Sequence, residues 1–179
     1  MDLTKKKSNS SFFVDRRFKI TYHLGSDREE TIMMKIGITN DHRGVDLKQF
    51  LTKYLEEIGY TVINYGTDST ESADFPVYAF KLGDAINSKD VDLGIAICGT
   101  GIGISIALNK MKGITCAKVA SLREAGLCRQ HNDANVIALG EDIDREEVKE
   151  IVKKFVTTNF LNEDKYIRRI NMIKDKENE

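Results

Sequence analysis

The stretch Leu93–Met111, LGIAICGTGIGISIALNKM, places a strand, a glycine-rich turn and a helix in direct succession. Its first five residues are apolar, as in a fully buried strand, and Ile102–Met111 fits a helix. Between them, glycine stands at positions 99, 101 and 103. A buried strand that leads through a short turn into a helix is the building unit of α/β folds.

The same alternation continues on both sides of this stretch. Short apolar runs predict strands at 35–39, 61–65, 93–97, 114–119 and 136–139. Helical patterns follow at 45–58, 77–87, 102–111, 122–130, 145–159 and 163–174. We therefore predict an α/β fold: a Rossmann-like three-layer α/β/α sandwich with a five-stranded parallel sheet in a single domain. Ligands of such sheets bind at the carboxyl ends of the strands.

Composition narrows the class of protein. The chain has 179 residues, 41% of them hydrophobic, and a net charge of −1. This suits one globular domain and gives no reason to expect nucleic acid or a membrane as partner. No apolar run approaches the roughly 20 residues that span a bilayer. Three cysteines without metal-type spacing predict free thiols, no metal and a cytoplasmic location.

The chain divides into three parts. Residues 1–33 read as an N-terminal extension, with at most one short strand around Phe18–Tyr22, and we expect it to be poorly ordered and uninvolved in chemistry. It lacks the apolar segment of a secretory signal. Residues 34–160 form the predicted catalytic domain, and 161–179 a C-terminal helix and tail.

The glycine turn permits two kinds of binding site. GTGIG matches the dinucleotide fingerprint incompletely, because Ile104 stands nearest the third glycine position and no clear acidic ribose partner follows about 20 residues on. A dinucleotide site is therefore disfavoured. Glycines that enter a helix still offer backbone N–H groups that can converge on an oxyanion.

Cys98 precedes this turn and has two readings. Beside the positive end of a helix a thiol favours the thiolate, which can remove a proton from carbon while the turn holds the resulting enediolate. The alternative is inert packing, since cysteine is among the most often buried residues. We favour packing for Cys116 in a strand and Cys128 in a helix.

Polar residues follow other predicted elements. Asp41 and His42 can supply a base and a hydroxyl or phosphate donor, or Asp41 is simply a helix N-cap. His131 and Asn132 either end a helix or carry a proton shuttle. Lys165 and Arg169 belong to a basic C-terminal segment, which is a solvated helix or a phosphate clamp.

Four blocks together resemble the type B ribose-5-phosphate isomerases and the related galactose-6-phosphate isomerases. The resemblance runs from about Met34 to Lys174. The blocks are NDHRG, YGTDS…ADFPVYA, ICGTGIGISIALNK and CRQHNDANVIALG, and the second half of this set is highly specific.

The resemblance implies a cofactor-free aldose–ketose isomerase that acts on an open-chain sugar phosphate through a cis-enediol. By position, Cys98 moves the proton between C1 and C2, and His131, helped by Asp41, opens the sugar ring. The enediolate oxygens are held by Thr100 and by the amides of Gly99, Gly101, Ile102 and Gly103.

The resemblance also implies a binding set. Asn109 and Asn132 bind sugar hydroxyls or brace the site, and His42, Lys165 and Arg169 take the phosphate. Family members are dimers or pairs of dimers with shared sites. We therefore expect a homodimer or tetramer in which His131 serves a neighbour's Cys98.

Several positions depart from the family pattern, and they bear on the substrate. Relatives usually carry GGRHxxR near the C-terminus, where this chain has Lys165 and Tyr166. Glu141-Asp142 replaces Gly/Ala-Arg, which puts a repelling charge in place of a potential phosphate donor. At two positions where relatives usually have tyrosine, this chain has Phe75 and Arg123. Arg123 is a candidate to compensate for the lost arginine.

Three functions follow. Within the family that the chain resembles, RQHND is typical of the ribose-phosphate branch, so the resemblance implies ribose 5-phosphate as the substrate and ribulose 5-phosphate as the product. The altered phosphate end leaves allose 6-phosphate or galactose 6-phosphate as alternatives, because one fold serves many substrates. A non-catalytic sugar-phosphate-binding module is the third possibility.

Overall fold

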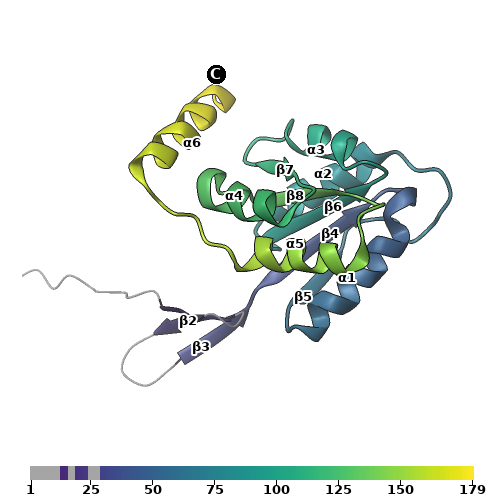
Figure 1. Ribbon diagram of the computed structural model, residues 1–179. Coiled ribbons are helices and arrows are strands. Elements are labelled where there is room, and N and C mark those ends of the chain that lie inside the picture. Colours follow the sequence, from purple (N-terminus) through teal and green to yellow (C-terminus); the bar gives the residue numbers. More distant parts are fainter. Residues whose placement is uncertain (1–12, 16–18, 24–28) are drawn as a thin grey trace, which may run out of the picture.

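A five-stranded, all-parallel sheet forms the centre of the computed structural model, which describes residues 13–15, 19–23 and 29–179, with side chains from Met33 onward (Figure 1). The strands are β4 (Lys35–Asn40), β5 (Thr61–Asn64), β6 (Leu93–Cys98), β7 (Cys116–Lys118) and β8 (Val136–Gly140), in the order β5-β4-β6-β8-β7. β4, β6 and β8 are the inner strands. Their residues are almost all buried, as expected for a sheet covered on both faces.

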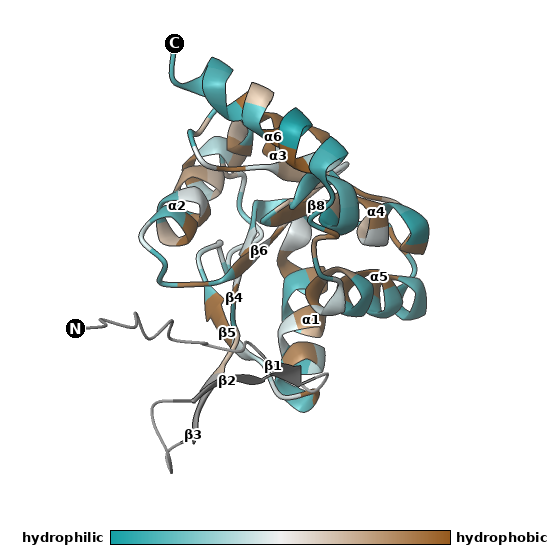
Figure 2. Cartoon of the chain, turned by 90° about the vertical axis from the view of Figure 1, so that its left-hand side faces the viewer, coloured by the Kyte–Doolittle hydropathy of each residue, from teal (hydrophilic) through white to brown (hydrophobic). Residues whose placement is uncertain are grey.

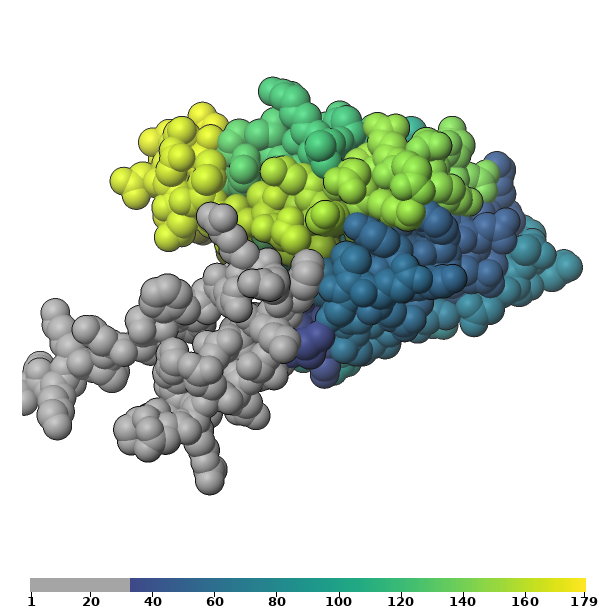
Figure 3. Space-filling model, turned by 60° about the horizontal axis from the view of Figure 1, so that its bottom comes forward, coloured from purple at the N-terminus to yellow at the C-terminus, as the bar shows by residue number. Residues whose placement is uncertain are grey.

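Helices cover both faces of the sheet and complete the three layers (Figure 2). Side chains at alternate strand positions, such as Ile95 and Ile97, pack on α1 (Val45–Glu57), α4 (Leu122–Asn132) and α5 (Arg145–Thr157). Ala96 and Cys98 point the other way, toward α2 (Phe75–Asn87) and α3 (Ile102–Leu108). Figure 3 shows the first face, with α1 in blue beside α5 in yellow-green.

The order of the strands fixes where a ligand can bind. From β4 the chain crosses to β5 on one side and then returns to β6 on the other side of β4. The loops that leave β4 and β6 therefore diverge, and ligands of open α/β sheets bind in the crevice at such a switch point. The Asp41 amide donates to the Ile97 carbonyl (3.2 Å), which ties these two strand ends together.

The predicted sandwich is confirmed, and the differences lie at element ends. α4 continues to Asn132, two residues past the predicted end, because Asp133 adopts the left-handed conformation (φ 48°) that closes the helix. α3 stops at Leu108 instead of Met111. α6 spans Asp164–Glu177. A 3₁₀ turn, η1 (His42–Gly44), was not predicted.

The N-terminal extension contains more strand than the single one predicted there. β1 (Phe13–Asp15), β2 (Lys19–His23) and β3 (Glu29–Met33) form an antiparallel sheet in that order. β2 coincides with the predicted strand. The expected poor order of residues 1–33 stays a prediction, and residues 1–12, 16–18 and 24–28 of this segment lie outside the described residues.

Candidate active site

Cys98 is the last residue of β6 and lies beside Gly140, its partner in the register with β8. Its side chain is 4% exposed, and Sγ accepts a hydrogen bond from the Gly101 N–H at 3.2 Å. Gly101 reaches this position with φ 75°, a conformation that favours glycine. A methyl group on Gly101 would lie 2.8 Å from the Leu139 carbonyl carbon, so β8 also leaves room only for glycine.

The three cysteines differ in their surroundings. The Cys98 sulfur faces a backbone N–H at the start of the glycine turn, and the thiolate is the form of a cysteine that acts as a base. Burial instead raises the pKa of Cys116 to about 12 and that of Cys128 to about 11. Both stay protonated at neutral pH. The Thr100 hydroxyl accepts from the Ile102 N–H (3.2 Å) and is exposed beside the turn.

Gly101→Ala tests whether this turn is built around its glycine. We expect a loss of about 2–4 kcal/mol of unfolding free energy, from left-handed strain and the contact with Leu139, together with reduced turnover. Gly59→Ala is the matched control, because Gly59 has φ 95° but its nearest neighbour would lie 3.9 Å away. Urea denaturation should show a loss of only about 1 kcal/mol for the control. Equal losses in both variants would contradict the proposed crowding.

Asp41 and His42 follow β4 and lie at the same carboxyl edge of the sheet. The Asp41 carboxylate is nearly buried and accepts the Arg43 N–H at 2.9 Å, so Asp41 caps η1. His42 Nδ1 accepts the Ala73 N–H at 3.1 Å. Nδ1 also lies 3.3 Å from the Ala73 carbonyl oxygen, and in the tautomer whose Nδ1 accepts the shorter bond the proton is on Nε2, which is then a hydrogen-bond donor.

Lys48 of α1, which the sequence did not single out, fixes the loop that carries Ala73. Its side chain is 3% exposed, and Nζ donates to the Thr67 carbonyl (2.5 Å) and to the Asp68 carboxylate. The hydrogen bond from Lys48 holds the pKa of Asp68 below its usual range. A buried ammonium needs such partners, and here they attach the loop after β5 to the helix that follows His42.

Arg43 and Glu141 form an ion pair from the ends of β4 and β8. The strand between them is β6, and the Arg43 guanidinium carbon and Nη1 lie 3.9 Å from where a methyl group on Gly99 would be. The pair therefore passes over the start of the glycine turn. Glu141, and more weakly Asp41 and Asp142, raise the pKa of Arg43. Arg123, the candidate for a compensating cation, lies in the first turn of α4, directly after β7, and its role stays a prediction.

The remaining predicted residues lie at the opposite, amino edge of the sheet. His131 and Asn132 are in the last turn of α4, which runs back from the end of β7 to the start of β8. The His131 ring stacks on Tyr166 of α6 with centroids 4.3 Å apart and planes 13° from parallel. Lys165 and Arg169 are exposed on α6, where Lys165 pairs with Glu163 at 2.7 Å.

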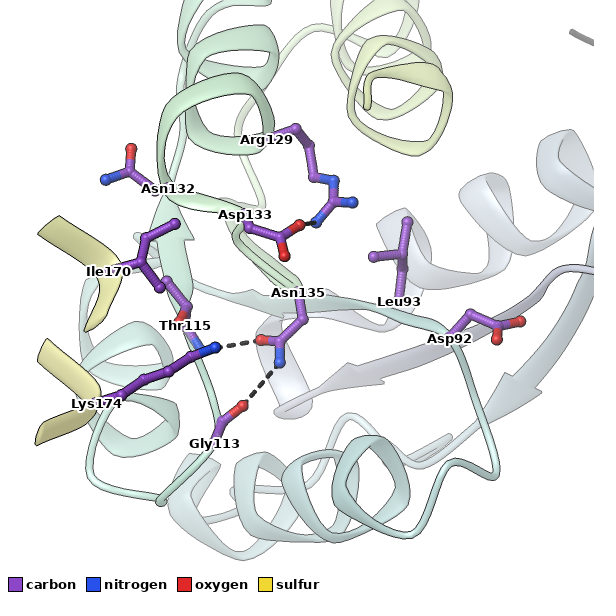
Figure 4. A pocket seen from close by; sticks show the side chains of 10 residues that line it. All are labelled: Asp92, Leu93, Gly113, Thr115, Arg129, Asn132, Asp133, Asn135, Ile170 and Lys174. Atoms are coloured by element: carbon purple, nitrogen blue, oxygen red, sulfur yellow. Dashed lines mark hydrogen bonds and ion pairs between the residues drawn. The ribbon is translucent and has the colours of Figure 1, made fainter. Parts of the chain in front are cut away.

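Figure 4 shows a pocket at this amino edge, between α6 and the ends of β6 and β8. Asn132 and Lys174 line it, as does Asn135, whose amide bonds to the Thr115 N–H and the Gly113 carbonyl. Asn109 lies nearby in the fold and its amide is engaged with the backbone of Ser105 and Cys116. It braces α3 against β7.

One chain therefore presents the predicted residues in two groups. The first, at the carboxyl edge, contains Asp41, His42 and the turn 98–103. The second, at the amino edge, contains His131, Asn132, Lys165 and Arg169. Strands of a parallel sheet separate the two groups, so a single chain does not bring Cys98 and His131 together.

Among the helices of the described residues, none is long and apolar enough to cross a membrane.

Comparisons with known proteins give this arrangement a family. Residues 36–173 match the family model described as Ribose/Galactose Isomerase. The chain is 46% identical to ribose-5-phosphate isomerase B of Escherichia coli over 111 residues, which are 62% of this chain and 74% of that protein.

Solved structures agree. Ribose-5-phosphate isomerase B of Clostridium thermocellum superposes with a TM-score of 0.79 at 40% identity, covering 81% of this chain and 98% of that one. The enzyme of Mycoplasma genitalium, solved with bound ribulose-5-phosphate, gives 0.76 at 37% identity and covers 82% and 97%.

Proposed function

The chain belongs to the ribose/galactose isomerase family, and on that basis we propose that it interconverts ribose 5-phosphate and ribulose 5-phosphate with Cys98 as the base. The observation that carries the proposal is the hydrogen bond from Gly101 N–H to Cys98 Sγ at the topological switch point. It joins the Cys98 sulfur to a turn of backbone donors. An enediolate intermediate needs both.

The proton transfer follows from this geometry. The thiolate of Cys98 removes the proton on C2 of the open-chain aldose, and the electron pair moves through the C1–C2 bond to the carbonyl oxygen. The enediolate charge is held by the amides of the turn and by the Thr100 hydroxyl. A proton then passes from the C2 hydroxyl to the C1 oxygen, and the Cys98 thiol returns its own proton to C1, which gives the ketose.

Ring opening needs an acid and a base near the sugar, and we assign them to His131 and Asp41. Since these two lie at opposite edges of one sheet, we propose that His131 acts in the site of a second copy. Phosphate binding falls to His42, through Nε2–H, and to Lys165 and Arg169 of that second copy.

An exposed apolar stripe supports the homodimer. Val77 and Phe80 of α2 and Ile102 and Ile106 of α3 are each 43–57% exposed, and their two helices pack side by side. Ile102 lies within the glycine turn, between Gly101 and Gly103. A second copy that covers this stripe would lie next to Cys98, where its His131 could complete the site.

A panel of sugar phosphates tests the substrate. We expect the highest kcat/KM with ribose 5-phosphate, and lower values with allose 6-phosphate and galactose 6-phosphate. Glu141 and Asp142 motivate this comparison, because two carboxylates near the turn repel a sugar phosphate whose phosphate group lies close to them. A clear preference for either hexose phosphate would overturn the assignment of ribose 5-phosphate and keep the isomerase chemistry.

A binding module without catalysis is the remaining alternative. It predicts saturable binding of ribose 5-phosphate without exchange of solvent hydrogen at C1 or C2.

We also propose that the enzyme works in the cytoplasm, a location with which its three free cysteines agree.

A further inference from the structure

We propose that Arg43 is a phosphate-binding, specificity-determining residue of this site, and that Glu141 competes with the substrate phosphate for its guanidinium. The inference rests on the proposed function, since it concerns the phosphate group of the same substrate. It assigns a role to a residue that the sequence analysis did not include in the site.

Arg43 lies in a loop at the same edge of the sheet as Cys98. Three loops lie at the edge of the sheet where Cys98 ends β6. They follow β4, β6 and β8, and they comprise residues 41–44, 99–103 and 141–144. Arg43 is the one lysine or arginine among them. It is adjacent to His42, whose Nε2–H is a donor, and its guanidinium lies over Gly99. Two neighbouring residues thus offer anion-binding groups beside the turn.

The Arg43 side chain is accessible to a ligand. The side chain is 58% exposed while it pairs with Glu141, so it remains accessible to a ligand from solvent. A guanidinium matches phosphate oxygens with two parallel hydrogen bonds. Lys48 follows Arg43 in α1 and is also a cation, but its side chain is buried and already bonded to Thr67 and Asp68.

The surrounding charges determine the direction of the effect. Arg43 faces three carboxylates, those of Asp41, Glu141 and Asp142. Glu141 holds the guanidinium when no substrate is bound, and a phosphate dianion must displace it or share it. Glu141 therefore weakens phosphate binding, and its neutralisation strengthens it.

Two charge-removing variants have opposite expected effects. Arg43→Gln should raise KM for ribose 5-phosphate about tenfold or more, with kcat within about threefold of wild type, because a charge-assisted contact is lost. Glu141→Gln should lower KM several-fold. Arg43→Lys keeps the charge without the planar fork, and should give an intermediate KM.

Controls separate this role from a structural one. Glu146→Gln and Lys149→Gln each neutralise one partner of a second ion pair, on α5, whose atoms are 2.7 Å apart. Neither variant should change KM. A general disturbance of the fold would raise KM in both Arg43→Gln and Glu141→Gln, so the fall expected for Glu141→Gln is the discriminating sign.

Inorganic phosphate gives a readout that needs no turnover. Its dissociation constant, measured by calorimetry on the unmodified chain and the variants, should follow the same order as KM. If wild type binds phosphate through Arg43 but isomerises no pentose phosphate, the proposed function fails and this inference stands. The inference is overturned if the enzyme is active and Arg43→Gln changes neither its KM nor its affinity for phosphate. It is also overturned if Glu141→Gln raises KM.

Discussion

Cys98→Ala is expected to lower kcat for ribose 5-phosphate by about 10³-fold or more, because the variant keeps the turn but lacks the base. The side chain is buried and small, so its removal takes away the sulfur that Gly101 contacts and leaves a minor cavity. Binding of ribose 5-phosphate, measured by calorimetry, should persist, since the hydroxyl and phosphate contacts come from other residues.

Two comparisons make this result specific. Cys128→Ala removes a buried thiol from the opposite face of the sheet, and it should cost stability without a comparable loss of kcat. Cys98→Ser keeps the size of the side chain but not its acidity, and it should be nearly as inactive as Cys98→Ala. If Cys98→Ala retains ordinary turnover, another residue is the base and the proposed mechanism is wrong.

His131→Ala is expected to be the second most damaging change, with a loss of about 10²–10⁴-fold in turnover of the cyclic substrate, because ring opening loses its acid–base group. The His131 ring is held against Tyr166 by stacking, which orients it and adds to stability. Part of the measured effect therefore comes from packing. His131→Asn retains a polar group of related shape and helps to separate the two contributions.

Mixing two inactive variants tests whether the site is shared. If His131 serves a partner's Cys98, a mixed dimer of Cys98→Ala and His131→Ala subunits contains one intact site. Random exchange makes about half of the dimers mixed, so about a quarter of wild-type activity should return. No recovery after verified subunit exchange would place Cys98 and His131 of the same chain in one site, contrary to the fold described above.

The layers of the fold were accessible from sequence because hydrophobic periodicity and glycine placement determine them directly. Each of the five sheet strands and six helices overlaps a predicted segment. Element ends were not accessible, since they depend on tertiary contacts such as the left-handed Asp133 that lets α4 reach Asn132. β1 and β3 lack a strong alternating pattern and were missed for that reason.

The candidate site divides in the same way. The sequence alone identified Cys98, Asp41 and His42 as candidates, because each lies at or just after the end of a predicted strand, within a short recognisable motif. Arg43 was quoted within NDHRG and yet not assigned a role, because its partner Glu141 lies 98 positions away and only the sheet order brings them together. Lys48 carries no motif at all. Its burial gives it significance, and burial of a lysine is not readable from a helical pattern.

A proton NMR time course in D₂O with ribose 5-phosphate tests the central claim most directly. The proposed mechanism predicts ribulose 5-phosphate as the product, with deuterium incorporated at C1 as the thiol exchanges with solvent, and faster conversion than with allose 6-phosphate or galactose 6-phosphate. Saturable binding of ribose 5-phosphate with neither product nor deuterium incorporation would contradict it and identify the chain as a binding module.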